Sequence, residues 1–560
     1  MPTVLTRRQH AAPARHPQLR VVGDEDDRAD ALAISSKLYA AAIAGAVALG
    51  FLVRAGFVLG SDFPLNDGGL FYQMVRDLQH AHYALPQTTT YNGDHLPFIY
   101  PPLGLYLSGL LNDETGMGLA TVLRFVPLAV STLTIGAFFL LAREVLRTRL
   151  AVIAAVFAFA LVPRSFLWMI MGGGVTRAPG LLFALLTMYA AHAMYTRGGR
   201  RHAAAAAIFA GLALLSHIEM AWFAAFSCGL FFLAYGRSRR GVALSVAVVV
   251  GAVVMVSPWL ALMVARHGVA PFGSAFVAAG GTSTNPVIVL IELRFTNELL
   301  FPMTMALGGL GAVACVAGRR YLLPGWPVAI ALLDSRALGT DASVPLALLA
   351  GVAVADVLVP LAMRVPELSM AGGRGAAARA GERAAAGAAV AVLAGVVLYA
   401  FLTAMVSTPR QLSGLGADER AAMAWSAAHT PATGRFLIVS GDQWALDRTS
   451  EWFPVLAQRQ SVVTTQGYEW QSGGRFRARL RAYDDAQKCA SKDASCIAAW
   501  ADATRIPFDY VYLPKLAPRV ALIVDDEHEC CAALRQSLRG DSGYAVVYDG
   551  PAATIFKRRS

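Results

Sequence analysis

The chain has 560 residues, of which 56% are hydrophobic and 15% are charged, and its mean hydropathy is +0.50. This composition excludes an ordinary water-soluble globular protein of similar length. The net charge of +11 does not indicate nucleic-acid binding, because Lys and Arg form short clusters between apolar runs instead of one basic face.

Apolar runs of about 20 residues, the length that crosses a bilayer core, recur from about Ser36 to Thr408. We therefore predict a polytopic α-helical membrane protein with about eleven transmembrane helices. The predicted spans lie near residues 37–60, 119–142, 150–163, 178–195, 203–217, 220–235, 241–264, 299–318, 321–334, 344–363 and 385–408. The run at 321–334 is short for a span, so counts of about ten or twelve stay open.

Basic clusters occupy every second loop between these spans and predict the topology. They comprise Arg143, Arg147 and Arg149; Arg197, Arg200 and Arg201; Arg237, Arg239 and Arg240; Arg319 and Arg320; and Arg364, Arg374, Arg379 and Arg383. By the positive-inside rule these loops are cytoplasmic, and so is the N-terminal segment. Residues 1–36 have no apolar run, so we expect a disordered cytoplasmic tail and no cleaved signal peptide. An odd number of spans in the plasma membrane places the C-terminus outside.

The composition changes after Thr408. Short apolar segments at 435–440, 510–513 and 544–548 predict strands, and 418–429 predicts a helix. We predict a transmembrane domain over 37–408 and a soluble extracytoplasmic α/β domain over 409–560.

Four of the six cysteines lie in this C-terminal part. Oxidation is permitted outside the cytoplasm, so Cys489 and Cys496 are candidates for a disulfide, with Cys530 or Cys531 as alternatives. Cys228 and Cys315 fall within predicted spans and are interpreted as small packing residues.

The most informative stretch lies in the long first outer loop, residues 61–118. It contains Asn66-Asp67-Gly68-Gly69, an amphipathic segment, and then Tyr100-Pro101-Pro102-Leu103 before a second interfacial helix. This pattern resembles the protein O-mannosyltransferases and lipid A aminoarabinose transferases, which are family 39-like members of the GT-C superfamily. The resemblance implies a GT-C-like transmembrane domain and sugar transfer from a polyprenyl-phosphate donor on the outer face.

The resemblance also implies that Asp67 is the catalytic base. The chemistry agrees, since an acceptor hydroxyl must lose a proton as it attacks the anomeric carbon, and one nearby carboxylate can accept that proton. A phosphate leaving group needs no general acid, and a single displacement inverts the anomeric centre. The alternative for Asp67 is a helix cap or turn residue before two glycines.

Two further parts of the first outer loop are candidate substrate-binding elements. Asp94 and His95 follow Asn92-Gly93 and could bind the acceptor or a metal ion, although an Asx-turn explains the pattern equally well. Tyr100 opens Tyr100-Pro101-Pro102 and is a candidate acceptor contact; the alternative is an architectural role in setting the entry of the interfacial helix. The sequence leaves metal dependence open, with a divalent cation as a candidate cofactor.

Arginines on the predicted outer side are candidates for the donor phosphate, because they oppose the positive-inside bias. Arg177 follows Gly172-Gly173-Gly174, where backbone amides at a helix start can approach an anion; the alternative is a flexible turn with a snorkelling arginine. Arg336 resembles the position from which related enzymes reach the phosphate, and its alternatives are a salt bridge to Asp334 or a contact with a lipid headgroup. Arg266 and Arg294 are also on this side.

His217 and Glu219 stand in Ser216-His217-Ile218-Glu219, at the predicted outer end of a span. The segment is similar to a His-Pro-Glu element of related transferases, with Ile218 in place of proline. Both residues could orient the acceptor or hold a divalent cation with Asp67, while a helix cap is the alternative for Glu219.

The C-terminal part places aromatic residues beside carboxylates in Glu451-Trp452 and Glu469-Trp470, a combination that suits sugar stacking or ordinary core packing. Taken together, the sequence predicts a glycosyltransferase acting on a glycan, lipid or protein acceptor. The alternatives are a secondary transporter or flippase, for which we find no internal repeat, and a protein that binds lipid-linked glycans without transferring them.

Overall fold

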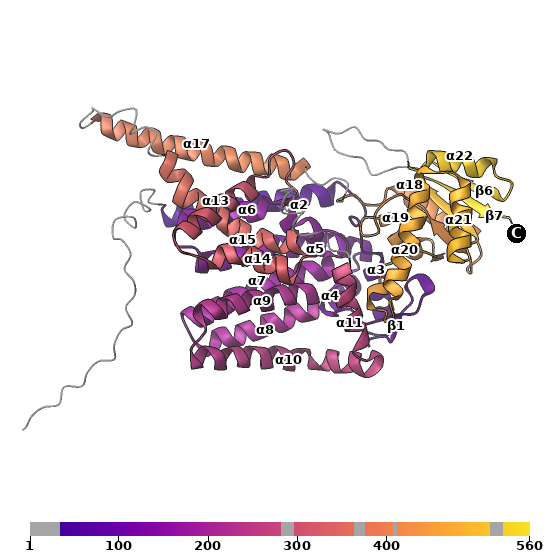
Figure 1. Cartoon of the computed structure of the whole chain (residues 1–560), viewed down its shortest axis with the longest axis horizontal. Coiled ribbons are helices and arrows are strands. Elements are labelled where there is room, and N and C mark those ends of the chain that lie inside the picture. The colour runs from indigo at the N-terminus through magenta and orange to yellow at the C-terminus, as the bar shows by residue number, and fades with distance from the viewer. Residues whose placement is uncertain (1–33, 282–295, 363–375, 407–410, 516–529, 560) are drawn as a thin grey trace, which may run out of the picture.

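Figure 1 shows a helical bundle with a smaller sheet-containing region at one end. The structure is a computed structural model that describes residues 34–281, 296–362, 376–406, 411–515 and 530–559. Residues 1–33 of the expected disordered tail, Arg294, and the basic residues Arg364 and Arg374 lie outside these residues.

A described helix coincides with each predicted span. These helices are α2 (Ser36–Leu59), α5 (Leu119–Val145), α6 (Arg149–Leu161), α7 (Gly174–Thr196), α8 (Arg200–Ser216), α9 (Ile218–Tyr235), α10 (Arg239–His267), α13 (Met303–Ala317), α14 (Leu322–Leu333), α15 (Leu338–Ala353) and α17 (Ala376–Val406). Six described helices are long and apolar enough to cross a membrane, or seven if α6 and the 3-10 turns after it, bent by 74°, count as one span. The helix positions are confirmed, but a count of eleven spans is not.

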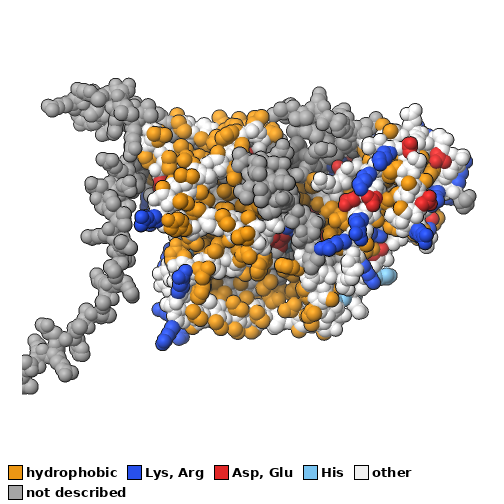
Figure 2. All heavy atoms as spheres, in the orientation of Figure 1, with side chains coloured by type: hydrophobic (Ala, Val, Ile, Leu, Met, Phe, Trp, Pro, Cys, Tyr) orange, Lys and Arg blue, Asp and Glu red, His pale blue; other side chains and the backbone are white. Residues whose placement is uncertain are grey.

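Side-chain caps start three of the helices at one end of the bundle. Ser35, Thr148 and Ser238 accept hydrogen bonds from the first-turn amides of α2, α6 and α10. The predicted cytoplasmic clusters at Arg147–Arg149 and Arg237–Arg240 flank two of these caps. Figure 2 shows basic side chains at this end and a wide hydrophobic surface between it and the C-terminal region.

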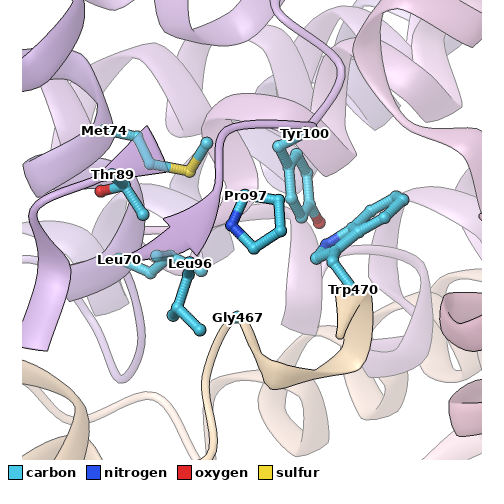
Figure 3. Close-up of a pocket in the computed structure, with 8 residues that line it drawn as sticks. All are labelled: Leu70, Met74, Thr89, Leu96, Pro97, Tyr100, Gly467 and Trp470. Carbon is cyan, nitrogen blue, oxygen red and sulfur yellow. The ribbon is translucent and has the colours of Figure 1, made fainter. Parts of the chain in front are cut away.

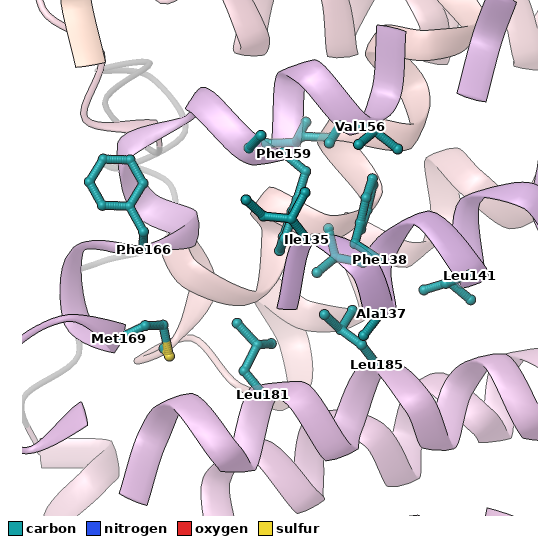
Figure 4. Packing of buried hydrophobic residues seen from close by; sticks show 14 of the residues in the cluster. Ile135, Ala137, Phe138, Leu141, Val156, Phe159, Phe166, Met169, Leu181 and Leu185 are labelled. Carbon is teal, nitrogen blue, oxygen red and sulfur yellow. The ribbon is translucent and has the colours of Figure 1, made fainter. Parts of the chain in front are cut away.

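The bundle core is built from apolar side chains that interdigitate between helices (Figure 4). Phe138 of α5 stacks on Phe159 of α6 with ring centroids 4.2 Å apart. Arg54 of α2 is fully buried beside them and donates to the carbonyls of Gly50 and Ala160, at 2.9 and 2.8 Å. A buried guanidinium needs such acceptors, so Arg54 joins α2 to the end of α6, just before the second predicted outer loop.

The first predicted outer loop is largely ordered into short elements. They are α3 (Gly69–His80), β1 (Thr88–Thr89), a 3-10 turn η1 (Tyr91–Gly93), β2 (Leu96–Pro97) and α4 (Leu103–Thr115). Strands β1 and β2 pair antiparallel. The close packing of α4 on α7 requires Gly104, because a Cβ there would lie 2.2 Å from the Val175 carbonyl oxygen.

The C-terminal part contains a five-stranded sheet in the order β4-β3-β5-β7-β6. Its strands are β3 (Arg435–Ile438), β4 (Gln460–Ser461), β5 (Tyr510–Pro514), β6 (Tyr544–Asp549) and β7 (Ala553–Arg558), with β3 parallel to β4 and β5, and β7 antiparallel to β5 and β6. The helices are α18 (Ala417–His429), α19 (Arg448–Leu456), α20 (Arg475–Gln487), α21 (Ala494–Thr504) and α22 (Ala532–Gly540). The predicted strands and the predicted helix at 418–429 are confirmed.

Two disulfides lie in this region. Cys489 is bonded to Cys496 with a Cα–Cα distance of 5.6 Å, as predicted, and Cys530 is bonded to Cys531. The alternative pairings between these two groups are therefore absent from the described residues. Cys228 and Cys315 are free thiols.

Candidate functional site

The site is centred on Asp67, which lies in the loop between α2 and α3 and is only 7% exposed. One carboxylate oxygen, Oδ1, accepts a hydrogen bond from the Gly173 amide at 2.8 Å, and Oδ2 is ion-paired with Arg177. Gly68 allows this geometry, because its φ of 127° is a conformation that side chains rarely adopt. Asp67 is therefore held by two groups at the start of α7, where the helix dipole favours a negative charge.

The glycine run of the second predicted outer loop makes this contact close. The Gly172 amide donates to the Leu65 carbonyl at 2.9 Å, and a Cβ on Gly172 would lie 2.1 Å from the Asp67 carbonyl oxygen. A Cβ on Gly173 would lie 2.6 Å from the Arg177 Nη2. Backbone amides near an anion were predicted here, and in the structure that anion is the Asp67 carboxylate.

Glu451, at the start of α19, comes from the C-terminal region and contacts the same loop. Its Oε1 accepts a hydrogen bond from the Gly68 amide at 2.8 Å, and its backbone carbonyl accepts one from the Tyr91 hydroxyl at 2.6 Å. Burial and, second, the neighbouring Asp67 carboxylate raise the pKa of Glu451 to about 8. The loop that carries Asp67 thus has two carboxyl groups and one arginine.

Trp452 fixes the C-terminal region against this loop. It is fully buried, its indole N–H donates to the Asn66 carbonyl at 2.9 Å, and its ring contacts Phe63 and Tyr72 at centroid distances of 4.6 and 5.8 Å. The alternative interpretation of Glu451-Trp452, core packing, therefore holds for the tryptophan. Because its ring lies in the protein interior, Trp452 offers no exposed face on which a sugar could stack.

Tyr100 connects the Asp67 loop to the C-terminal region through aromatic contacts. Its ring lies edge-on to Phe71 at 4.9 Å and to Trp470 at 5.7 Å, and 6.3 Å from the His217 ring. Figure 3 shows Tyr100 and Trp470 side by side at a cavity of about 10 Å³, which is room for about one water molecule. Burial raises the pKa of Tyr100 to about 12.

Arg336 lies between α14 and α15, with its Nε 3.9 Å from Glu219 Oε1. The sequence offered Asp334 as its ion-pair alternative, and the structure gives Glu219 instead. The Arg336 side chain is 40% exposed, so an anion can reach it.

Two polar residues near Arg336 have buried atoms for which the described part of the chain provides no hydrogen-bond partner. Both carboxylate oxygens of Asp341, in the first turn of α15, are in this state, and so is Nδ1 of His217. Sequence reasoning missed Asp341, although an acidic residue directly before an apolar run at the membrane edge is a signal of function.

Asp94 and His95 are not brought into contact with this group. Asp94 is paired with Arg479 at 3.4 Å, and it accepts hydrogen bonds from Asn92 at 2.6 Å and Gln460 at 3.1 Å. His95 is exposed. In the structure Asp94 therefore joins the first predicted outer loop to the C-terminal region, and an acceptor or metal role for either residue stays a prediction.

Within the described ranges no group of three His, Cys, Asp or Glu side chains is positioned to hold a metal ion. The two oxygens of Asp67 are occupied by the Gly173 amide and Arg177. A cation at Asp67 would have to displace the arginine, so the residues present do not form a ready metal site.

The candidate residues share one end of the bundle. Asp67 follows α2, Arg177 opens α7, His217 and Glu219 join α8 to α9, and Arg336 precedes α15. This end faces the C-terminal region in Figure 1, away from the capped and basic end. Topology alone predicted this shared face; Glu451, which comes from the C-terminal region, was not assigned to the Asp67 group.

The family of dolichyl-phosphate-mannose-protein mannosyltransferases matches residues 100–262. This range contains Tyr100, Arg177, His217 and Glu219, and it begins after Asp67. No curated protein matches the chain.

Solved structures resemble the chain at low sequence identity. The apo oligosaccharyltransferase of Archaeoglobus fulgidus has a TM-score of 0.55 and 13% identity, covering 86% of this chain and 70% of that one. ArnT from Cupriavidus metallidurans bound to undecaprenyl phosphate has a TM-score of 0.51 and 14% identity, and the match covers 93% of this chain and 98% of that one. The arabinofuranosyltransferase AftD from Mycobacteria has a TM-score of 0.54 and 16% identity, and the match covers 95% of this chain but 40% of that one. These similarities establish a shared fold.

Proposed function

The chain has the fold of the GT-C glycosyltransferase superfamily, as its motifs predicted, and from this premise we propose that it is a membrane glycosyltransferase. It transfers a sugar from a polyprenyl-phosphate donor to an acceptor hydroxyl. The acceptor is a glycan, a lipid or a protein. Among the solved structures with this fold, ArnT is bound to undecaprenyl phosphate, and an archaeal oligosaccharyltransferase is bound to a dolichol-phosphate and a peptide. These ligands support a lipid phosphate as the carrier.

The observation that carries the proposal is the buried Asp67 carboxylate, oriented by the Gly173 amide and by Arg177. In the reaction the acceptor oxygen attacks the anomeric carbon while its proton passes to Asp67. The bond from that carbon to the phosphate oxygen breaks, and the electron pair leaves with the polyprenyl phosphate. Attack from the face opposite the phosphate inverts the anomeric centre. No step requires a metal ion.

Arg336 is the proposed donor-phosphate ligand. Its guanidinium is accessible, and its Glu219 partner is at 3.9 Å, a loose ion pair that a phosphate can replace. Arg177, also predicted to bind the phosphate, is occupied by Asp67 in the structure. We propose that Arg177 mainly balances the charge of Asp67 and that Arg336 stabilises the negative charge on the leaving phosphate.

The proposed location of the reaction is the outer face of the plasma membrane. The site lies at the end of the bundle opposite the basic helix ends, which the positive-inside rule places in the cytoplasm. The Cys489–Cys496 disulfide supports an oxidising compartment for the C-terminal region. His217, Glu219 and Tyr100 line the same end and are proposed to contact the acceptor.

The test is sugar transfer from synthetic polyprenyl-phosphate sugars by detergent-purified protein, comparing wild type with Asp67→Asn. We expect the variant to lose at least about a hundredfold in kcat, the usual range for a general base. Asp77→Asn is the matched control, since Asp77 is also a buried aspartate of the first outer loop, but its carboxylate accepts hydrogen bonds from Thr89 and Thr90. Full activity of Asp67→Asn would contradict the base assignment.

The same assay with a chelator decides the metal dependence. Because Arg177 occupies the carboxylate of Asp67, we expect turnover to survive chelation. If the folded wild-type protein binds lipid-linked sugars but transfers none, the alternative of a binding or flipping protein is correct.

A further inference from the structure

The Asp67 loop is held by the C-terminal region at a backbone atom next to the proposed base. The Gly68 amide, adjacent to Asp67, donates to the Glu451 carboxyl group at 2.8 Å. A Cβ on Gly69 would lie 2.5 Å from the Glu451 carbonyl oxygen, so the two segments are in direct contact. Asn66, on the other side of Asp67, donates its backbone amide to the Ser413 carbonyl at 2.9 Å.

Taking the proposed transferase function as its basis, we propose that Glu451 is a positioning residue for Asp67. By accepting the Gly68 amide, its side chain fixes the loop in the conformation that presents the Asp67 carboxylate to Gly173 and Arg177. The C-terminal region thereby contributes a residue to the transfer centre, although Glu451 lies 383 residues after Gly68 in the sequence.

The charge of Glu451 matters because the surrounding charges are nearly balanced. Asp67 faces it from the loop, Arg177 from α7 and the Tyr91 hydroxyl from η1, while Asp447 precedes it in its own segment. Burial and then Asp67 raise the pKa of Glu451 to about 8. At pH 7 Glu451 is neutral, so Asp67 is the only carboxylate of this group that pairs with the Arg177 guanidinium. When Glu451 ionises, the centre gains a second negative charge and repels an anionic donor.

The variant Glu451→Gln separates the two roles of the side chain. The amide oxygen can still accept the Gly68 hydrogen bond, but the group cannot ionise. We expect Glu451→Gln to keep kcat within about twofold of wild type at about pH 6.5. Above about pH 8 the donor KM should rise in wild type and stay constant in the variant. Glu451→Ala removes the acceptor, and we expect a loss of about tenfold or more in kcat at every pH, because the loop shifts.

Glu419→Gln is the matched control. Glu419 is also a buried carboxylate of the C-terminal region, but its side chain accepts hydrogen bonds from Arg448, at 3.1 Å, and from the Gly416 amide, and not from Gly68. A merely structural effect of losing a buried carboxylate would appear in this variant too. We expect the pH dependence of its donor KM to match that of wild type.

A second measurement needs neither donor nor turnover. An acid whose pKa is raised in the folded state binds more protons than the unfolded chain between its ordinary pKa and about 8, so stability falls as pH rises through that range. The Tm of wild type should therefore fall relative to Glu451→Gln from about pH 5 to about pH 8 and then run parallel. A Tm difference that does not change with pH, or a Glu451→Ala variant with wild-type kcat, would overturn the proposal. Absence of transfer by wild type, with the expected Tm behaviour, would instead refute the proposed function and leave the loop contact standing.

Discussion

At the scale of single residues, Gly173 is the position where the least change has the largest consequence for the site. A Cβ there would lie 2.6 Å from Arg177 Nη2 and 2.8 Å from both Asp67 Oδ2 and a Phe71 ring carbon. The methyl group of an alanine at this position would therefore push the Asp67 carboxylate and the Arg177 guanidinium apart. We expect Gly173→Ala to lower kcat/KM for transfer by about tenfold or more, which is about 1.4 kcal/mol of transition-state stabilisation.

The measurement is steady-state transfer, with Gly136→Ala as the control. Gly136 lies within α5, and a Cβ added there would meet nothing within 4 Å, so alanine fits without a shift. Both variants should purify as folded protein. Equal activity of Gly173→Ala and Gly136→Ala would mean that the Asp67–Arg177 contact has no part in catalysis.

The sequence singled out individual candidate residues but not their partners. Asp67 was found because an acidic residue before two glycines at a span end is distinctive, and Arg177 because it follows three glycines. Their mutual pairing was not predicted, since it joins residues of two loops and a single sequence carries no information on that distance. The link from Glu451 to Gly68 was missed for the same reason. Asp94 has the same turn-like sequence context as Asp67, and only the fold shows that its partner is Arg479.

At the scale of elements, the Cys489–Cys496 disulfide joins the 3-10 turn after α20 to the start of α21. With a sequence separation of 7, the chain-entropy estimate for its contribution is about 2 kcal/mol. We expect a Cys489→Ser, Cys496→Ser double variant to lose about that much local stability. Hydrogen exchange of the α21 amides, measured by mass spectrometry, should become faster by roughly thirtyfold.

Cys228→Ser is the control for this prediction, because it removes a free thiol within the bundle and should leave the exchange of α21 unchanged. Unchanged exchange in the double variant would mean that the packing of Trp500 and Ile497 alone holds α21 in place.

Helix positions were predicted well because apolar runs and basic loops repeat along the chain, and each apolar run is long enough to be recognised without information from the rest of the chain. The sheet was predicted only in part. Strand β4 has two residues and no periodicity to detect, and β7 was missed even though the side chains of Ala553–Phe556 are buried. The pairing of β7 between β5 and β6 depends on contacts across the sheet, which a local pattern does not encode.

At the scale of the whole molecule, charge and shape are arranged along one axis. Basic side chains flank the capped helix ends and hydrophobic side chains cover the middle (Figure 2). Asp67 lies at the other end, where the neighbouring Gly68 amide donates to Glu451 of the C-terminal region. A polyprenyl chain lying along the hydrophobic surface would bring its phosphate to that end, where Arg336 is accessible. The orientation of this axis in the membrane therefore decides on which face transfer occurs.

This orientation is testable with single cysteines introduced at the two ends. Arg237 lies in the loop before α10 at the basic end, and Ser472 lies before α20 in the C-terminal region; both are exposed. In intact cells a membrane-impermeant maleimide should label Ser472→Cys but label Arg237→Cys only after permeabilisation, because the positive-inside rule places the basic end in the cytoplasm. The parent chain, whose free thiols Cys228 and Cys315 lie within the bundle, gives the background. The reverse labelling pattern would place Asp67 on the cytoplasmic face, where the donor would have to be a lipid-linked sugar of the inner leaflet.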